Sequence, residues 1–260
     1  MRRLAVSLVF ALSALPGQAL GSTVCPPATG EDRIEGVSAD GDLLLRSRGA
    51  ARLADLRLPE SSPAREAALR WLGDRRGQAV LVQGGPARDR WNRMVVRLVL
   101  VRGAVRLDVA HGLLENGLAV VDPATGDRSC VLATLAVEVT ARDRGLGVWA
   151  DDRYKPVLVG DIARLRDRVG RFTLVEGRIR SVGERRQQTY LNFGSHWARD
   201  FTIIVPKRVW SLVQESGLGA AALRGRHIRA RGVLEDRRGP SMTVTARDAI
   251  EVLEGTDKKH

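Results

Sequence analysis

Three short stretches in the first half of the chain carry side chains that could act on phosphate esters. Asp40-Gly41-Asp42 is the first, Arg52 and Glu60 follow it, and Asp89-Arg90-Trp91-Asn92-Arg93 comes later, just before an apolar run. A carboxylate beside a bound water can take its proton. A forked guanidinium can hold two phosphate oxygens at once. These residue types in this order indicate a phosphate-handling site, although Asp40-Gly41-Asp42 alone is equally typical of an ordinary turn.

This order of residues resembles the staphylococcal nuclease (thermonuclease-like) family over residues 33–149. Two further segments support the resemblance. Residues 113–119 are similar to the family's L-x-x-x-G-L-A helix end, and residues 146–149 are similar to its closing Leu-Gly-Val-Trp. The resemblance implies a small OB-type barrel with three helices, and it implies calcium-dependent hydrolysis of DNA or RNA phosphodiesters.

Carried over by position, the resemblance assigns a role to four of these residues. Asp42 matches a calcium-ligating carboxylate, and Glu60 matches the glutamate that activates the attacking water. Arg52 and Arg93 match the two arginines that grip the phosphate. Guanidiniums suit this role because negative charge grows on the phosphate in the transition state. Without the family, Arg52 and Glu60 would also be explained as an ion pair that closes the barrel.

The chain departs from the family at the second calcium ligand. The family has an aspartate three residues before the glutamate, in D-x-P-E, where this chain has Arg57. Two unit charges about 4 Å apart interact by about 4 kcal/mol at an effective dielectric of about 20, so the exchange turns attraction into comparable repulsion. Asp55, two positions earlier on the same strand face, is the nearest replacement metal ligand. We therefore expect Arg57 to join Arg52 and Arg93 as a third phosphate contact, in a protein that binds nucleic acid rather than cutting it.

Three alternatives stay open at this point. One is an active calcium-dependent endonuclease on DNA or RNA, in which Asp42 and Asp55 hold Ca²⁺. Another is weak or metal-independent hydrolysis, in which Arg57 partly replaces the charge of the metal. The third is an envelope protein whose domains bind protein or cell-wall polymer, with the basic surface incidental.

Short strands and a few helices must position these residues. In the first half, apolar runs and turn residues predict strands at 34–37, 43–45, 51–56, 78–83 and 94–101. Helices are predicted from Ser62 to Gly73 and over 105–116 and 129–144. The second half is predicted as three strands (172–182, 189–193, 200–205), a helix (207–216) and two strands (228–234, 241–246). That succession is the order of an OB-type barrel.

The expected fold class is therefore mainly β with helices, built as two tandem small barrels. A nuclease-like domain is predicted at 22–150 and an OB-fold-like domain at 157–254, with a linker at 151–156 and a polar tail at 255–260. Nucleic acid is the expected partner, because aromatic rings stack on bases while arginines contact phosphates. Besides Arg57, the residues expected to make these contacts are Arg90, Trp91, Tyr190, Trp197 and Arg199.

Composition and the N-terminus indicate a compartment. The formal net charge is +12 and its surplus is mostly arginine, which suits phosphate but also fits an anionic membrane surface or wall polymer. Residues 1–21 combine Arg2 and Arg3, an apolar run and small residues at its end. This pattern predicts a cleaved signal peptide and export to the periplasm or medium, with no stable membrane insertion afterwards. Cys25 and Cys130, the two cysteines of the chain, are then expected to form a disulfide.

Overall fold

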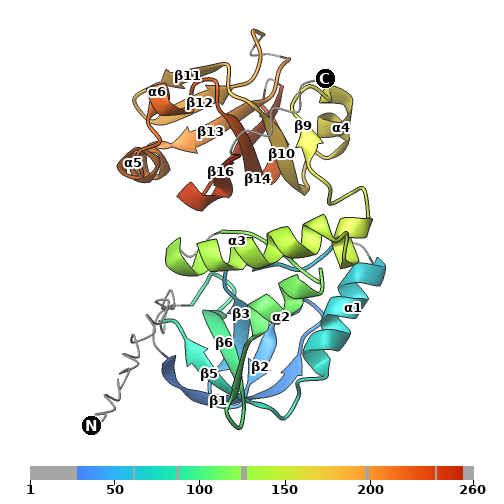
Figure 1. The fold of residues 1–260 in the computed structure, drawn as a ribbon. Coiled ribbons are helices and arrows are strands. Elements are labelled where there is room, and N and C mark those ends of the chain that lie inside the picture. Colours follow the sequence, from blue (N-terminus) through green and yellow to red (C-terminus); the bar gives the residue numbers. More distant parts are fainter. Residues whose placement is uncertain are drawn as a thin grey trace, which may run out of the picture.

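The computed structural model describes residues 28–60, 62–85, 88–123, 128–196, 199–237 and 239–253. The chain is mainly β with helices, as the sequence predicts (Figure 1). Within the described residues, no helix combines the length and the apolarity needed to cross a membrane. The predicted signal peptide, Cys25, Trp197 and the tail at 255–260 lie outside the described residues.

The first unit, residues 28–150, is built on a six-stranded sheet. Its strands are β1 (Ala28–Val37), β2 (Leu43–Leu45), β3 (Gly49–Leu53), β5 (Ala79–Gln83), β6 (Met94–Arg102) and β7 (Val105–Asp108). The sheet order is β3-β2-β1-β5-β6-β7, and β3 also pairs with β6 in parallel. The pairings β1–β2, β2–β3, β3–β6, β6–β5 and β5–β1 therefore form a closed circuit of hydrogen-bonded neighbours.

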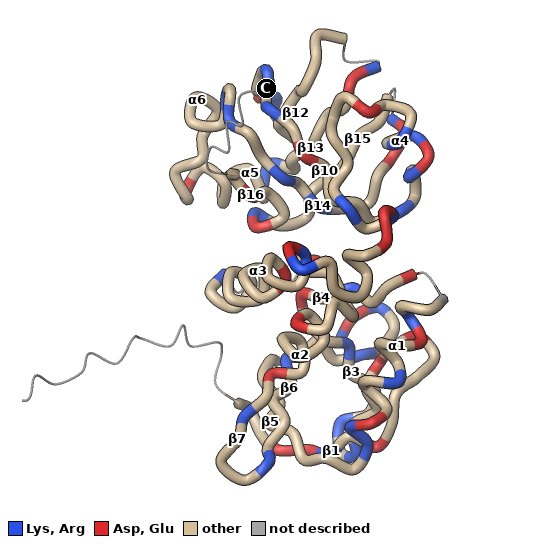
Figure 2. The backbone as a smooth tube through the Cα atoms, turned by 45° about the vertical axis from the view of Figure 1, so that its right-hand side comes forward, with Lys and Arg blue, Asp and Glu red and all other residues tan. Residues whose placement is uncertain are grey.

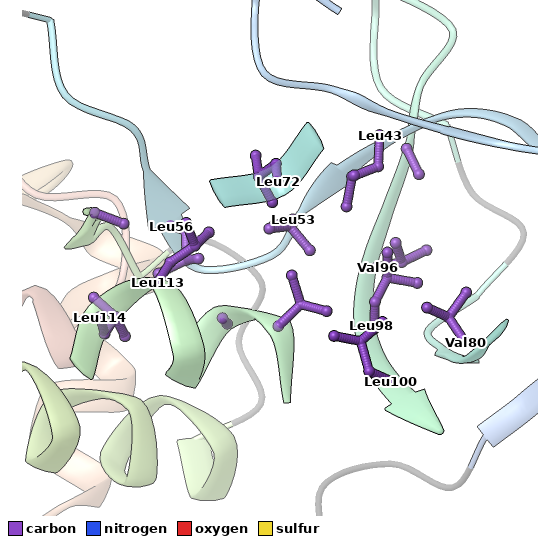
Figure 3. Close-up of a cluster of buried hydrophobic side chains, with 14 of the residues drawn as sticks. Leu43, Leu53, Leu56, Leu72, Val80, Val96, Leu98, Leu100, Leu113 and Leu114 are labelled. Atoms are coloured by element: carbon purple, nitrogen blue, oxygen red, sulfur yellow. The ribbon is translucent and has the colours of Figure 1, made fainter. Parts of the chain in front are cut away.

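Leucine and valine side chains from the strands and helices of this unit meet in one core. The helices are α1 (Ser62–Gly73), α2 (Val109–Glu115) and α3 (Arg128–Asp143). Successive strand residues point to opposite faces. On β6 this buries Val96, Leu98 and Leu100, which meet Leu72 of α1 and Leu113 of α2 in the core (Figure 3). Burying one such side chain contributes about 1.5–3 kcal/mol.

Two element boundaries in this unit differ from the prediction. The strand expected at 51–56 is two elements, because Asp55 turns the chain with a φ of 57°. After this turn β4 (Leu56–Arg57) pairs with β8 (Val120–Val121) instead. The helix expected at 105–116 begins as the strand β7, because a turn at Gly103 (φ 58°) returns the chain along β6. Helix α2 starts only after Asp108, whose carboxylate accepts a hydrogen bond from the His111 N–H at 3.0 Å.

The second unit, residues 157–253, is built on a separate eight-stranded sheet. Its strands are β9 (Val157–Leu158), β10 (Phe172–Arg178), β11 (Ser181–Glu184), β12 (Gln188–Asn192), β13 (Thr202–Pro206), β14 (His227–Asp236), β15 (Pro240–Thr243) and β16 (Ile250–Val252). Its helices are α4 (Ile162–Asp167), α5 (Lys207–Glu215) and α6 (Ala220–Leu223). In the order β11-β12-β13-β15-β14-β10 the first and last strands are consecutive in the chain, since β11 directly follows β10. The single strand expected at 172–182 is thus β10 and β11.

Helix α3 lies between the two units, and a buried ionic network joins it to the second one (Figure 1). The Arg231 side chain of β14 is 0% exposed and its Nη2 lies 2.9 Å from Glu138 of α3 and 2.6 Å from Glu251 of β16. Its Nη1 donates to the Val121 carbonyl at 2.9 Å. Burial opposes the charged form of Arg231, but Glu138 and Glu251 outweigh it and raise its pKa. The two units therefore share a charged, buried joint.

Candidate functional site

The Arg93 side chain lies between two carboxylates on the outside of the first unit. Its Nη1 donates to Asp42 Oδ1 at 3.0 Å. Its Nη2 and Nε donate to Asp89 Oδ2 at 2.7 and 2.9 Å. The hydrogen bonds from Arg93 lower the pKa of Asp89 to about 2, and the same bonds raise the pKa of Arg93. We call Asp42, Asp89 and Arg93 the Arg93 cluster.

Local turn chemistry places both carboxylates of this cluster. Asp89 Oδ1 accepts hydrogen bonds from the backbone N–H of Trp91 at 2.9 Å and of Arg93 at 3.1 Å. Within that turn Asn92 has a φ of 60°, a conformation that asparagine tolerates better than most residues. Asp42 follows Gly41, whose φ is 89° and where a Cβ would collide with the Leu58 side chain. Both turns therefore require the residue types that the sequence has there.

Strand pairing brings Arg52 to the same face as this cluster. In the β2–β3 pair Leu43 lies opposite Ala51, so extending that register by one residue places Asp42 across from Arg52. In the β3–β6 pair Arg52 lies opposite Val95, which shares its strand face with Arg93 two residues earlier. Arg52 is half-buried, and its side chain makes no hydrogen bond or ion pair among the described residues. Its charge is available to a ligand.

Glu60 is exposed and comes two residues after Leu58, whose side chain lies against Gly41 beside Asp42. The Glu60 backbone N–H donates to the Tyr154 hydroxyl at 2.9 Å. Arg65 links the segment before Glu60 to the segment before Asp42. It donates to the Pro59 carbonyl at 3.3 Å and to the Ala39 carbonyl at 2.9 Å. Within the described part of the chain, the Glu60 carboxylate forms no ion pair, so the Arg52–Glu60 pair considered from the sequence is not made.

Trp91 projects from the loop that carries the cluster. It is 56% exposed, a large fraction for an indole. The guanidinium carbons of Arg90 and Arg93 lie 3.9 and 4.7 Å from the centre of its ring. An exposed aromatic ring and two cations are thus grouped at one place.

The residues expected to hold calcium do not come together. Asp55 is 3% exposed and its Oδ2 accepts from Arg97 Nη2 at 2.8 Å inside the unit. It turns inward because the chain reverses at its own positive φ, so the expectation that Asp55 shares an outward strand face with Arg57 is wrong. Asp42 is engaged by Arg93. No group of three or more His, Cys, Asp or Glu side chains suited to a metal exists among the described residues. The described donor set therefore does not fit Ca²⁺, which wants several oxygen ligands.

Arg57 does not contact Arg52 or Arg93 by any hydrogen bond in the described structure. Its Nη2 donates to Asp122 Oδ2 at 2.9 Å, and its guanidinium carbon lies 4.8 Å from the Phe172 ring centre. It faces the second unit, because β4 pairs with β8 rather than continuing β3. The expected three-arginine site on the first unit is therefore two arginines, and Arg57 belongs to a different cavity.

That cavity is a cleft of about 700 Å³ between the two units. We call it the inter-unit cleft. Its walls carry Arg57, Glu60, Tyr154 and Phe172, together with other residues that no sequence motif marks. The charged ones among these are Arg153, Arg164, Asp167, Arg168 and Arg171.

In the second unit, Tyr190 lines a separate groove of about 800 Å³ with Arg185, Asn192 and Arg237. The groove runs over β12 and β13, where the sequence places the nucleic-acid contacts. Arg199 is exposed but is not part of this lining, and Trp197 lies outside the described residues. Cys130 is buried and disulfide-bonded.

Comparison with known proteins adds no family assignment. No family model matches the chain. No curated protein matches it either. Function must therefore be argued from the geometry of the residues.

Proposed function

We propose that this protein binds nucleic acid on the face that carries Arg52, Trp91 and Arg93, and that binding needs no calcium. The observation that supports this most is Trp91, which is 56% exposed with two guanidiniums beside its ring. An indole left in water beside cations has what base stacking and phosphate contact require. Arg52 adds a charge with no partner among the described residues.

Hydrolysis is not part of the proposal, because the described carboxylates do not form a metal site. Glu60 is exposed, and the two acids beside Arg93, Asp42 and Asp89, are both bound to that arginine. Two arginines and an aromatic ring can bind a nucleic-acid strand. They lack the cation that would stabilise the growing charge of a leaving oxygen in the related family.

We also propose the thermonuclease-like family for the first unit and OB-type barrels for both. The closed circuit of strand pairs in the first unit supports this, as does the sheet order of the second. A helix interrupts the strands in each unit: α1 follows β3 and β4 in the first, and α5 follows β13 in the second. Export through the predicted signal peptide belongs to the same proposal, and the mature N-terminus of secreted protein tests it.

Fluorescence anisotropy with labelled single-stranded DNA and RNA tests the binding. Trp91→Ala should weaken binding by about 1–3 kcal/mol for one stacked base, which is about 5- to 150-fold in Kd. Trp91→Phe keeps a ring and should recover most of the loss. Arg52→Gln should also weaken binding, whereas Arg106→Gln, an exposed arginine on β7, is the matched control.

Two results would contradict the proposal. Wild-type affinity in both Trp91→Ala and Arg52→Gln would remove this face from the interaction. Cleavage that a chelator stops and Glu60→Gln abolishes would establish the calcium-dependent nuclease instead.

A further inference from the structure

The inter-unit cleft concentrates positive charge, and ion pairs among the described residues neutralise only part of it. Its lining contains five arginines and two carboxylates, Glu60 and Asp167. Arg57 is paired with Asp122, and Arg153 is paired with Asp151. Arg164, Arg168 and Arg171 have no carboxylate within ion-pair distance among the described residues. Figure 2 shows basic positions along α4 and the chain beside it.

Arg168 is the most constrained of these three arginines. It is 9% exposed, and its guanidinium donates to the main-chain carbonyls of Asp152 at 2.5 Å and Lys155 at 3.2 Å. Burial, and then the neighbouring charges of Arg164 and Arg171, lower its pKa. Neutral carbonyls fix its position but leave its charge in place. An anion entering the cleft would relieve the repulsion among the three.

The walls of the cleft come from both units, and the two walls contact each other through Arg57 and Phe172. Arg57 projects from β4 of the first unit and stacks over Phe172 of β10 in the second, 4.8 Å from the ring centre. The cleft borders the turn that carries Asp42, because Leu58 lines the cleft and its side chain lies against Gly41. The cleft therefore adjoins the Arg93 cluster on the side of the Asp42 turn.

From this arrangement we propose that the inter-unit cleft binds backbone phosphates of the same nucleic-acid strand, with Arg164, Arg168 and Arg171 as the contacts. This inference rests on the proposed function and adds a second phosphate site to it. A volume of about 700 Å³ lies within the range of sites that enclose small molecules, which accommodates a nucleotide unit of the strand. Binding there also clamps the strand between the two units.

The salt dependence of binding measures this contact directly. For a single strand, each neutralised phosphate contributes about −0.7 to the slope of log K against log salt. Arg164→Gln and Arg171→Gln should each make the slope shallower by about 0.7, and the double variant by about 1.4, if each arginine holds one phosphate. Arg166→Gln is the matched control, because Arg166 is exposed on the same helix and is not part of the cleft lining.

A second experiment measures by calorimetry the binding of tripolyphosphate, which has phosphates but no bases. Wild type and Arg52→Gln should bind it, and the Arg164→Gln/Arg171→Gln double variant should not. The inference is overturned if the cleft variants match Arg166→Gln in both experiments while Trp91→Ala and Arg52→Gln still weaken strand binding. In that case the proposed function stands without the cleft. If the wild-type protein binds no strand under any salt condition, the proposed function and this inference both fail.

Discussion

Replacing Arg231 with methionine should strongly destabilise the protein, because it leaves Glu138 buried without its main partner. Both side chains are 0% exposed, and their charged atoms lie 2.9 Å apart. Glu138 would keep only Arg142 at 3.5 Å and the Val121 N–H at 2.6 Å. Removing one member of a buried ion pair costs about 3–5 kcal/mol, since the other charge stays desolvated. We expect Arg231→Met to lower the free energy of unfolding by that amount.

Replacing both members should cost less than the sum of the single changes. In Arg231→Met/Glu138→Leu no unpaired acid remains between α3 and β14, and apolar side chains of similar size fill the space. Glu251 is 18% exposed and keeps Arg229 nearby, so it can be solvated. The double variant should therefore recover part of the stability that either single variant loses.

Urea unfolding followed by tryptophan fluorescence and by far-ultraviolet circular dichroism measures these free energies. The control is Arg46→Met, which removes an ion pair to Glu35 whose side chains are 62% and 51% exposed. That change should cost less than about 1 kcal/mol. A cost below about 1 kcal/mol for Arg231→Met, or a double variant equal to the sum of the singles, would refute the account of the joint.

Two further predictions concern the first unit. The folded pKa of Asp89 is about 2, below its ordinary 3.8, so its stabilising contribution is complete above about pH 4 and is lost as the pH falls through about 2. NMR titration should show this pKa rising in Arg93→Gln, and an unchanged value would contradict the pairing. Arg57→Asp would set a carboxylate beside Asp122 and should lower stability without creating calcium affinity. Calorimetric calcium binding that also requires Asp42 would show that the site was complete except for Arg57.

The face that carries Arg52 and Arg93 follows from patterns that the sequence displays. Alternation along a strand determines which side chains point outward, and the turns at Gly41 and Asn92 require residues of these types. The pairing of β2 with β3 and of β3 with β6 then brings Asp42 to Arg93. The sequence also showed Asp89 four residues before Arg93, a spacing that suits an ion pair, although its partner role was not predicted.

Asp55 and Arg57 could not be placed from the sequence, because their orientation depends on distant partners. Asp55 turns inward to Arg97, and β4 turns toward β8, a segment that local pattern does not connect to it. Arg168 and Arg171 were missed for a related reason. They carry no motif, and they line a cleft only because the two units lie side by side in the fold.

The buried joint has a consequence for the order in which the chain is made. Glu138 is synthesised 93 residues before Arg231, its partner in the completed protein. A chain that emerges from the ribosome N-terminal end first therefore presents the acid of α3 to water until most of the second unit has appeared. The joint between the two units can therefore form only after β14 has been synthesised, and not when the core of the first unit forms.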